Sequence, residues 1–256
     1  MEENNLKITA IIKTKNAEDT ICETLESIKE LDEIIIVDEH STDDTIEIAK
    51  EYKAKIIFAD KNDLSQGLNQ ALEQAIGDWI FIVEQDEIIP QKLLAEILRY
   101  TESPKKNKFC ASFAQKTFYL GKEIKSQRKK SVLRLFKKDF CTFKNDFSTD
   151  LILKKGKIHK INSNFKIQNC CILKFEKKDI SRRMVEIIEK NRFISKNSKS
   201  NSSIFLKPAF AFLNNYLLKG GIFDGKRGFI FAKESYVEEL ILQVTNFEKQ
   251  RSNNDF

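Results

Sequence analysis

The sequence predicts an α/β protein with a mainly parallel central sheet and a helical extension at its C-terminal end. Three observations support this class. Short apolar runs alternate with amphipathic segments through the first 83 residues, which is the pattern of consecutive β-α-β units. Two of these runs, 34–37 and 79–83, are continuously apolar, as strands covered on both faces are. Polar clusters follow the runs, at the edge where open α/β sheets bind ligands.

The first part of the chain is predicted to contain strands and helices in strict alternation. Apolar runs rich in β-branched residues predict the strands, at 6–12, 34–37, 55–58 and 79–83. Apolar spacings of three and four residues predict the helices, at 17–31, 45–52 and 68–76. Gly77 ends the third helix, and the segment 41–44 offers an N-cap for the second. This order implies right-handed crossovers between parallel strands.

The second part of the chain is less regular. Strands are predicted at 113–120, 133–136, 158–161 and 167–175, and an amphipathic helix follows at 180–194. The serine-rich stretch 195–203 predicts a linker, which places one domain at 1–195 and a helical extension at 196–256. In that extension an apolar, aromatic run at 204–232 is broken at 219–221 and 224–228, and a final helix is predicted at 234–249.

The amino-acid composition argues against metal-stabilised, disulfide-rich and membrane-spanning proteins. The five cysteines form no Cys-x-x-Cys pair and the chain has two histidines, so a zinc site or a disulfide scaffold is not expected. No signal peptide is expected, and no stretch approaches the ~20 apolar residues of a membrane span.

Charge is distributed unevenly along the chain. Residues 1–100 carry 10 Lys/Arg and 23 Asp/Glu, whereas residues 101–256 carry 34 and 15. The basic half predicts an anionic partner, such as a phosphorylated glycolipid or a membrane surface, unless its lysines simply fill solvated faces. Nucleic acid is not the expected partner, because no aromatic stacking platform interleaves with the basic residues and no nucleic-acid motif is present.

The stretch 78–87 is the most informative of the chain, because an apolar strand stops there in Glu84, Asp86 and Glu87. Two carboxylates this close can hold a divalent cation through oxygen, and the cation can bind a diphosphate. The alternative is a strand that ends in a solvated acidic turn. Polar residues also follow the first two strands, and parallel topology would gather them at the same edge. These residues are Thr14, Asn16, Asp38 and Ser41.

The order and spacing of these residues resemble the family 2 inverting glycosyltransferases, which have the GT-A fold. The matching segments are 11–18, 32–38, 41–45, 69–72, 77–80 and 84–87. Downstream, the chain is similar to the bacterial subgroup that glycosylates the lipopolysaccharide inner core, including the glucosyltransferase that acts on the first heptose. The residues that carry this second likeness are Leu120-Gly121, Arg134-Leu135-Phe136, Asp150, Gly156-Lys157, Leu206-Lys207-Pro208, Phe223-Asp224-Gly225 and Gly228-Phe229.

The resemblance implies a nucleoside-diphosphate sugar as donor and Mg²⁺ or Mn²⁺ as cofactor. The cation neutralises the leaving diphosphate, and Asp86 is expected to be its first ligand, with Glu84 second. Asp38 is expected to accept hydrogen bonds from the base or ribose. The residues expected to line the same pocket are Thr14, Asn16, Glu18, Ser41 and Asn69.

Inversion requires a general base that deprotonates the acceptor hydroxyl. Asp150 is the candidate, because in the subgroup an acid precedes the Gly-Lys dipeptide at this spacing. Arg134 is expected to hold a phosphate or an anionic group of the acceptor. The alternatives are that Asp38 caps the next helix, that Asp150 is a solvated loop acid, and that Arg134 belongs to a surface salt bridge.

Four residues depart from the family pattern. Glu84 stands where the metal motif has Asp, Gln85 where it has a small residue, and His40 where the preceding turn has Gly. Leu68 is a fourth departure, because the family usually has Arg before Asn69. A positive φ at residue 40 would be costly for most side chains, and less so for His than for a branched residue.

Two functions from different classes are therefore predicted. The first is metal-assisted transfer of a sugar to an anionic glycolipid, which is expected at the cytoplasmic face of the inner membrane. The apolar run 204–232 would then either contact the lipid or belong to the hydrophobic core. The second is a non-catalytic protein of the same fold that acts as a binding or assembly partner. Retention of Asp86, Asp38, Asn16 and Thr14 favours the first.

Overall fold

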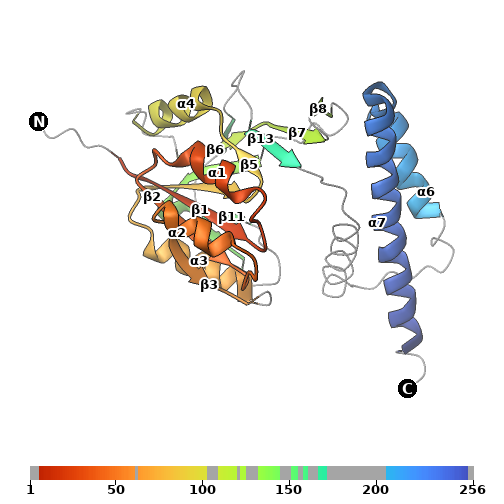
Figure 1. Cartoon of the computed structure of the whole chain (residues 1–256), viewed down its shortest axis with the longest axis horizontal. Helices are drawn as coiled ribbons and strands as arrows, with labels where there is room; N and C mark the ends of the chain where they lie inside the picture. The colour runs from red at the N-terminus through yellow and green to blue at the C-terminus, as the bar shows by residue number, and fades with distance from the viewer. Residues whose placement is uncertain are drawn as a thin grey trace, which may run out of the picture. The chain divides into compact units, whose positions relative to one another are not determined.

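The computed structural model describes residues 6–60, 63–102, 109–119, 122–124, 132–144, 151–154, 158–160, 167–171 and 206–252. The chain forms two compact units, one of residues 1–116 and 129–170, the other of residues 117–128 and 171–256. In Figure 1 the red to yellow elements belong to the first unit, and the blue helices belong to the second. The domain boundary predicted at 195/196 and the helix predicted at 180–194 lie outside the described residues.

The first unit is built on a seven-stranded sheet of order β12-β6-β9-β4-β1-β2-β3 (Figure 1). Strands β3, β2, β1 and β4 are parallel neighbours, which confirms the predicted α/β class with a mainly parallel sheet. β9 runs antiparallel to both β4 and β6. The strands are β1 (Ile8–Thr14), β2 (Glu33–Asp38), β3 (Lys55–Phe58), β4 (Trp79–Glu84), β6 (Cys110–Phe113), β9 (Val132–Lys137) and β12 (Ile158–Lys160).

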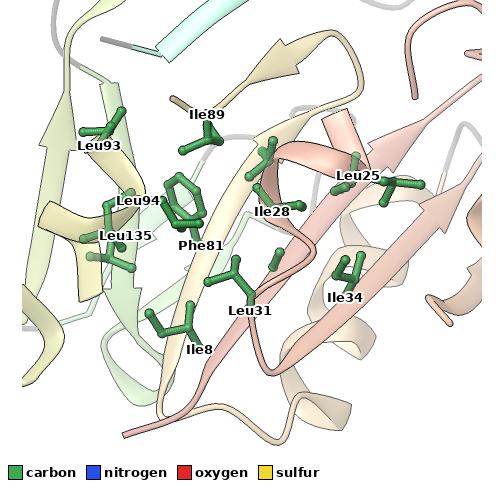
Figure 2. Close-up of a cluster of buried hydrophobic side chains, with 14 of the residues drawn as sticks. Ile8, Leu25, Ile28, Leu31, Ile34, Phe81, Ile89, Leu93, Leu94 and Leu135 are labelled. Carbon is green, nitrogen blue, oxygen red and sulfur yellow. The ribbon is translucent and has the colours of Figure 1, made fainter. Parts of the chain in front are cut away.

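Both faces of this sheet are covered, because successive residues of each strand point to opposite sides. Ile8, Ala10 and Ile12 of β1 join one core cluster, under α1 (Ile21–Ile28), α2 (Thr45–Glu51) and α4 (Gln91–Glu102). Figure 2 shows this cluster, with Ile28 of α1 and Leu94 of α4 lying near Phe81. Ile11 joins the other cluster, under α3 (Leu64–Gln74) and the hairpin of β10 (Cys141–Phe143) and β11 (Leu151–Leu153).

Acids tie the amino ends of the strands together. The backbone N–H of Ile8 donates to Asp32 Oδ2 at 2.8 Å, and that of Ile76 donates to Glu33 Oε2 at 2.8 Å. The N–H of Lys7 donates to Asp78 Oδ2 at 3.2 Å. All three acids belong to segments that resemble the family, and in the structure they stabilise the sheet through these hydrogen bonds.

Some predicted boundaries are wrong. α1 begins at Ile21 and not at 17, because the carbonyl of Ala17 accepts turn hydrogen bonds from Thr20 and Ile21. α3 begins at Leu64, four residues before its predicted start. The predicted strand 113–120 divides into β6 and β7 (Gln115–Tyr119), and β7 pairs with β8 (Lys122–Glu123). Two elements were not predicted from the sequence, namely α4 and the short strand β5 (Glu87–Ile88), which pairs with β13 (Ile167–Cys171).

The C-terminal segment is helical, as predicted. α6 (Leu206–Leu213) continues into a π-helical segment (Asn214–Leu218), and a 3₁₀ turn (Gly221–Asp224) leads into α7 (Gly225–Ser252). The predicted break at 224–228 is correct at its start but wrong at Gly228, which lies inside α7. Across the described residues, every helix falls short of the length and apolar character needed to cross a membrane.

Candidate active site

Asp38 lies at the carboxyl end of β2, level with Thr14 at the end of β1. Its Oδ2 accepts hydrogen bonds from Thr14 Oγ1 at 2.8 Å and from Ser41 Oγ at 2.6 Å. Its Oδ1 accepts a third, from the backbone N–H of Ser41 at 2.7 Å. Both oxygens are therefore engaged, and the carboxylate fastens the loop after β2 to the end of β1.

The loop after β1 is bound to the loop after β2 by a second set of hydrogen bonds. The N–H of Asn16 donates to Ser41 Oγ at 2.7 Å, and Asn16 Oδ1 accepts the N–H of Thr42 at 2.8 Å. Glu18 Oε2 accepts the N–H of Asp44 at 3.2 Å. The structure thus brings together five of the six residues predicted to bind the nucleotide.

The burial of Asp38 changes what its carboxylate can do directly. Asp38 is 0 % exposed, so a ligand can reach its oxygens only if the loop that carries Ser41 moves. The alternative that Asp38 caps α2 is wrong, because the N-cap of that helix is Asp44. Asp38 therefore positions its neighbours in this structure, and direct contact with a donor stays a prediction.

An exposed aromatic pair lies beside this cluster. Phe58, level with Asp38 at the end of β3, is 56 % exposed and stacks on His40, with ring centroids 5.6 Å apart and planes 11° apart. His40 Nε2 lies 3.2 Å from Asp60 Oδ1. The φ of His40 is 58°, so this residue does adopt the left-handed conformation in which the family pattern has Gly. The pair offers a flat surface of the kind on which a nucleobase stacks.

The end of β4 is organised around a buried arginine. Arg134 Nη1 donates to Glu84 Oε1 and Nη2 donates to Glu87 Oε1, both at 2.8 Å. Arg134 is the extra residue of a β-bulge in β9, where Leu135 pairs with Ala111 and Leu133 with Ser112. A bulge redirects a side chain, and this one sends the guanidinium to the acids at the end of β4. The alternative of a surface salt bridge is wrong, because Arg134 is buried.

Glu87 is the most strongly perturbed acid of this edge. Its side chain is 0 % exposed, and Oε2 accepts the N–H of Glu84 at 3.0 Å. Burial raises the pKa of Glu87 to about 7, although Arg134 and the Glu84 amide both lower it. The geometry identifies Glu87 as an anchor of Arg134.

Asp86 lies in the turn between β4 and β5 and is half-buried. Arg134 engages Glu84, which was predicted as the second metal ligand, and Asp86 stays the predicted first ligand. The described residues contain no group of three side chains that could hold a metal by themselves. Mg²⁺ commonly takes one or two carboxylates and completes its shell with substrate phosphates and water, so Asp86 and a diphosphate together are a suitable donor set.

Gln85 connects the two clusters. Its Oε1 accepts the N–H of Lys15, after β1, at 2.8 Å, and its carbonyl accepts Thr24 Oγ1 of α1 at 3.0 Å. Lys15 Nζ in turn donates to the carbonyl of His40 at 2.9 Å and to that of Glu39. The residue that departs from the family pattern therefore joins the turn after β4 to the loops after β1 and β2.

Two predicted residues do not join these clusters. The Asn69 side chain bonds β10, with Nδ2 donating to the Phe143 carbonyl at 3.0 Å and Oδ1 accepting the Phe143 N–H at 2.9 Å. Asn69 lines a cavity of about 1000 Å³ between α3 and the β10–β11 hairpin. Asp150 lies outside the described residues.

Sequence reasoning missed the roles of Glu87, Phe58 and Gln85. The role of Glu87 could have been predicted, because a third acid at the end of a buried strand requires a buried cationic partner. Arg134, already expected to bind an anionic group, was the candidate for that partner. Phe58 carried a weaker signal, as an aromatic residue at a strand end. Nothing in the sequence showed that Gln85 would bond the loop after β1.

Comparison with known proteins identifies the family of the chain. The family model "Glycosyl transferase family 2" matches residues 9–167. An uncharacterised glycosyltransferase of Rickettsia typhi is 31 % identical over 147 residues, 56 % of this chain and 50 % of the relative. The poly(ribitol-phosphate) beta-N-acetylglucosaminyltransferase TarS of Staphylococcus aureus is 28 % identical over 109 residues, 38 % of this chain and 19 % of that protein. The chain thus spans about half the length of the first relative.

A solved structure supports the fold. The mannosyltransferase PcManGT from Pyrobaculum calidifontis, in complex with GDP-Man and Mn²⁺, superposes with a TM-score of 0.52 at 14 % identity. The match covers 95 % of this chain and 87 % of that one. At this identity the likeness shows the fold, which is α/β with C-terminal helices.

Proposed function

Because the chain belongs to glycosyl transferase family 2, we propose that it transfers a hexose from a nucleoside-diphosphate sugar to a hydroxyl of an anionic glycolipid, with inversion and with a divalent cation. The observation that carries this proposal is the alignment of the ends of β1, β2 and β4 at one edge of the sheet. Gln85 bonds the polar clusters of this edge to one another.

The donor would bind along the ends of β1, β2 and β3. The stacked His40 and Phe58 rings offer a flat surface on which the nucleobase would stack. The hydrogen bonds from Thr14 and Ser41 to Asp38 fix the loop that carries His40. Mobile loops bind more weakly because ordering them costs entropy, so the fixed loop favours donor binding.

Asp86 would hold the cation, and the cation would neutralise charge on the leaving diphosphate. Arg134 would fix Glu84 and Glu87 behind that turn, and so keep Asp86 at the edge. The proposed general base, Asp150, would take the proton of the acceptor hydroxyl on the face opposite the leaving group.

We propose an acceptor that carries phosphate, with the lipopolysaccharide core as the specific candidate. Residues 101–256 supply the excess of Lys and Arg that such an acceptor requires. The name of the TarS relative also describes a phosphate-bearing acceptor, poly(ribitol-phosphate). The site of action would then be the cytoplasmic face of the inner membrane.

One observation favours the second function, a binding or assembly partner without transferase activity. Glu84 is engaged by Arg134, and it stands where the family motif has an Asp ligand. A weakened metal site would follow if Asp86 alone could not retain the cation.

A panel of nucleoside diphosphates and their sugars, with Mn²⁺ or with chelator, tests the proposal. A cognate ligand at 100 times its dissociation constant should stabilise the protein by roughly 2.7 kcal/mol, read as a higher melting temperature. The cognate sugar should also be hydrolysed or transferred only when metal is present. Stabilisation without turnover would support the binding partner, and the absence of both would overturn the proposed donor class.

A further inference from the structure

α6 is apolar on every side. Apart from Lys207, its residues are all apolar, and a helix of this kind is normally buried. One side packs on α7: Phe212 meets Phe229 edge to face, with ring centroids 5.7 Å apart, and Tyr216, in the next turn, also contacts Phe229 at 5.6 Å. That contact accounts for only one side of the helix.

The other side of α6 is exposed. Its large apolar residues recur at spacings of four, three and four residues, which places them on one stripe that continues into the π-helical segment. Phe210, in the middle of this stripe, is 64 % exposed. The stripe consists of Leu206, Phe210, Leu213 and Leu217, all exposed.

The turn between α6 and α7 exposes further apolar residues. Leu218 is 74 % exposed and Phe223 is 87 % exposed, and Ile222 is exposed beside them. The backbone holds this turn closed, because a Cβ at Gly228 would lie 1.9 Å from the Gly221 carbonyl oxygen. Since close backbone packing closes the turn, its apolar side chains are left to point outward.

Positive and negative side chains are separated along the hairpin formed by α6 and α7. Near the turn the cations outnumber the acids, with Asp224 as the one acid from 206 to 233. Farther along α7, the stretch 234–247 holds Glu234, Glu238 and Glu239 and no Lys or Arg. The cations at the turn are Lys219, Lys226 and Arg227, and Lys233 follows two turns along α7. Lys207 lies at the other end of α6, where its Nζ donates to Gln243 Oε1 of α7 at 3.5 Å.

We propose that the exposed stripe of α6 and the turn that follows it insert into the interface of an anionic lipid bilayer. Apolar side chains bordered by Lys and Arg match a surface whose headgroups are negative and whose interior is apolar. Long cationic side chains can reach the headgroups while apolar neighbours lie deeper. The cations at the turn argue for anionic lipid as the partner, because they complement its headgroups at the point where the apolar side chains are most exposed.

This inference goes beyond the proposed transfer reaction and does not depend on it. Its first test is co-sedimentation of the full chain with vesicles of phosphatidylcholine, alone or mixed with phosphatidylglycerol. The protein should sediment with the anionic vesicles at low salt and lose most of that binding at high salt, because exposed charges are screened.

Two paired variants separate the apolar and the charged contributions. Leu218→Ser with Phe223→Ser should weaken binding roughly tenfold or more, since each removes a large apolar side chain from the interface. Lys226→Gln with Arg227→Gln should weaken binding by roughly tenfold at low salt and have little effect at high salt. Ile76→Ser, at an exposed apolar position of the first unit, is the matched control and should bind as the wild type does.

Circular dichroism and melting temperature establish that each variant is folded. Failure of the wild type to bind anionic vesicles at low salt overturns the inference, and so does equal binding by the Leu218/Phe223 variant. A wild-type dimer that this variant loses in sedimentation would also overturn it, in favour of a second copy. Nucleotide-dependent stabilisation without vesicles reports on the proposed donor separately, so the two proposals can fail independently.

Discussion

At the end of β2, Asp38 is held by the hydroxyls of Thr14 and Ser41, whereas at the end of β4, Glu84 and Glu87 share the guanidinium of Arg134. Both regions bury an acid at the same edge of the sheet. In the first, neutral donors satisfy one carboxylate and close a loop. In the second, the guanidinium of Arg134, on a bulge of β9, donates hydrogen bonds to two carboxylates and fixes the turn that carries Asp86. Under the proposed function, the first region would shape the donor-binding surface and the second would support the cation site.

The buried acid of each region differs in exposure from the acid that is proposed to bind the cation. Asp38 and Glu87 are fully buried, while Asp86 is half-buried between them in the motif order. If this division is correct, substitutions should affect the free energy of unfolding strongly at the buried groups and weakly at Asp86.

The largest effect on stability is expected for Arg134→Met at about pH 8, where Glu87 is ionised. The change leaves two acids at the end of β4 without their counter-charge, and breaking a buried pair from one side costs about 3–5 kcal/mol. Urea unfolding followed by circular dichroism measures it. Arg99→Met, on the exposed part of α4, should change stability by about 0.5 kcal/mol or less. A loss below about 1 kcal/mol at Arg134 would mean that the second region does not depend on its cation.

The next effect is a pH dependence that arises from Glu87. Glutamate ordinarily titrates near 4.5, and burial raises the pKa of Glu87 to about 7, so the folded state binds this proton more tightly than the unfolded state. The stabilisation is complete below pH 4.5 and is lost as the pH rises through about 7. Its full extent is about 3 kcal/mol, since one pKa unit corresponds to about 1.4 kcal/mol.

Unfolding free energies of the wild type and Glu87→Gln, measured from pH 4 to about pH 8 in chelator, isolate this contribution. The difference between the two proteins should change across the interval in favour of Glu87→Gln as the pH rises. Parallel curves would show that folding does not raise the pKa of Glu87.

Asp38→Ala should cost about 2–3 kcal/mol, because three hydrogen bonds to a buried carboxylate disappear and leave their donors unpaired. The same change should remove nucleotide-dependent stabilisation, since the loop that carries His40 loses its anchor. Asp60→Ala, in the neighbouring exposed loop, should cost far less and keep part of the nucleotide response. Full nucleotide binding by Asp38→Ala would show that the first region does not shape the donor site.

The fold was largely predictable because apolar periodicity reports burial directly. The parallel core of β1, β2, β3 and β4 followed from four apolar runs, and the polar residues after them were correctly placed at one edge. The partner of each acid was not predictable in the same way. Arg134 reaches Glu84 across 50 positions of the chain through a bulge, and a bulge leaves no periodic signal. Asn69 fitted the motif order, yet its amide is committed to β10, which the sequence analysis did not recognise as a strand.

The smallest effect on stability, and the sharpest test of the comparison, is expected at Asp86. Asp86→Asn keeps the size of a half-buried side chain in a turn, so the free energy of unfolding should change by about 0.5 kcal/mol or less. The amide is a much weaker ligand for a hard cation than the carboxylate, so Mn²⁺-dependent nucleotide stabilisation should disappear and turnover should fall ~10²-fold or more. Asp139→Asn, at an exposed acid after β9, is the matched control and should retain both responses. If Asp86→Asn keeps wild-type turnover and chelator leaves the wild type active, the cation does not belong to this turn. If instead Asp86→Asn unfolds the protein as Arg134→Met does, Asp86 belongs with the buried acids, and the division between supporting and acting carboxylates at the end of β4 is wrong.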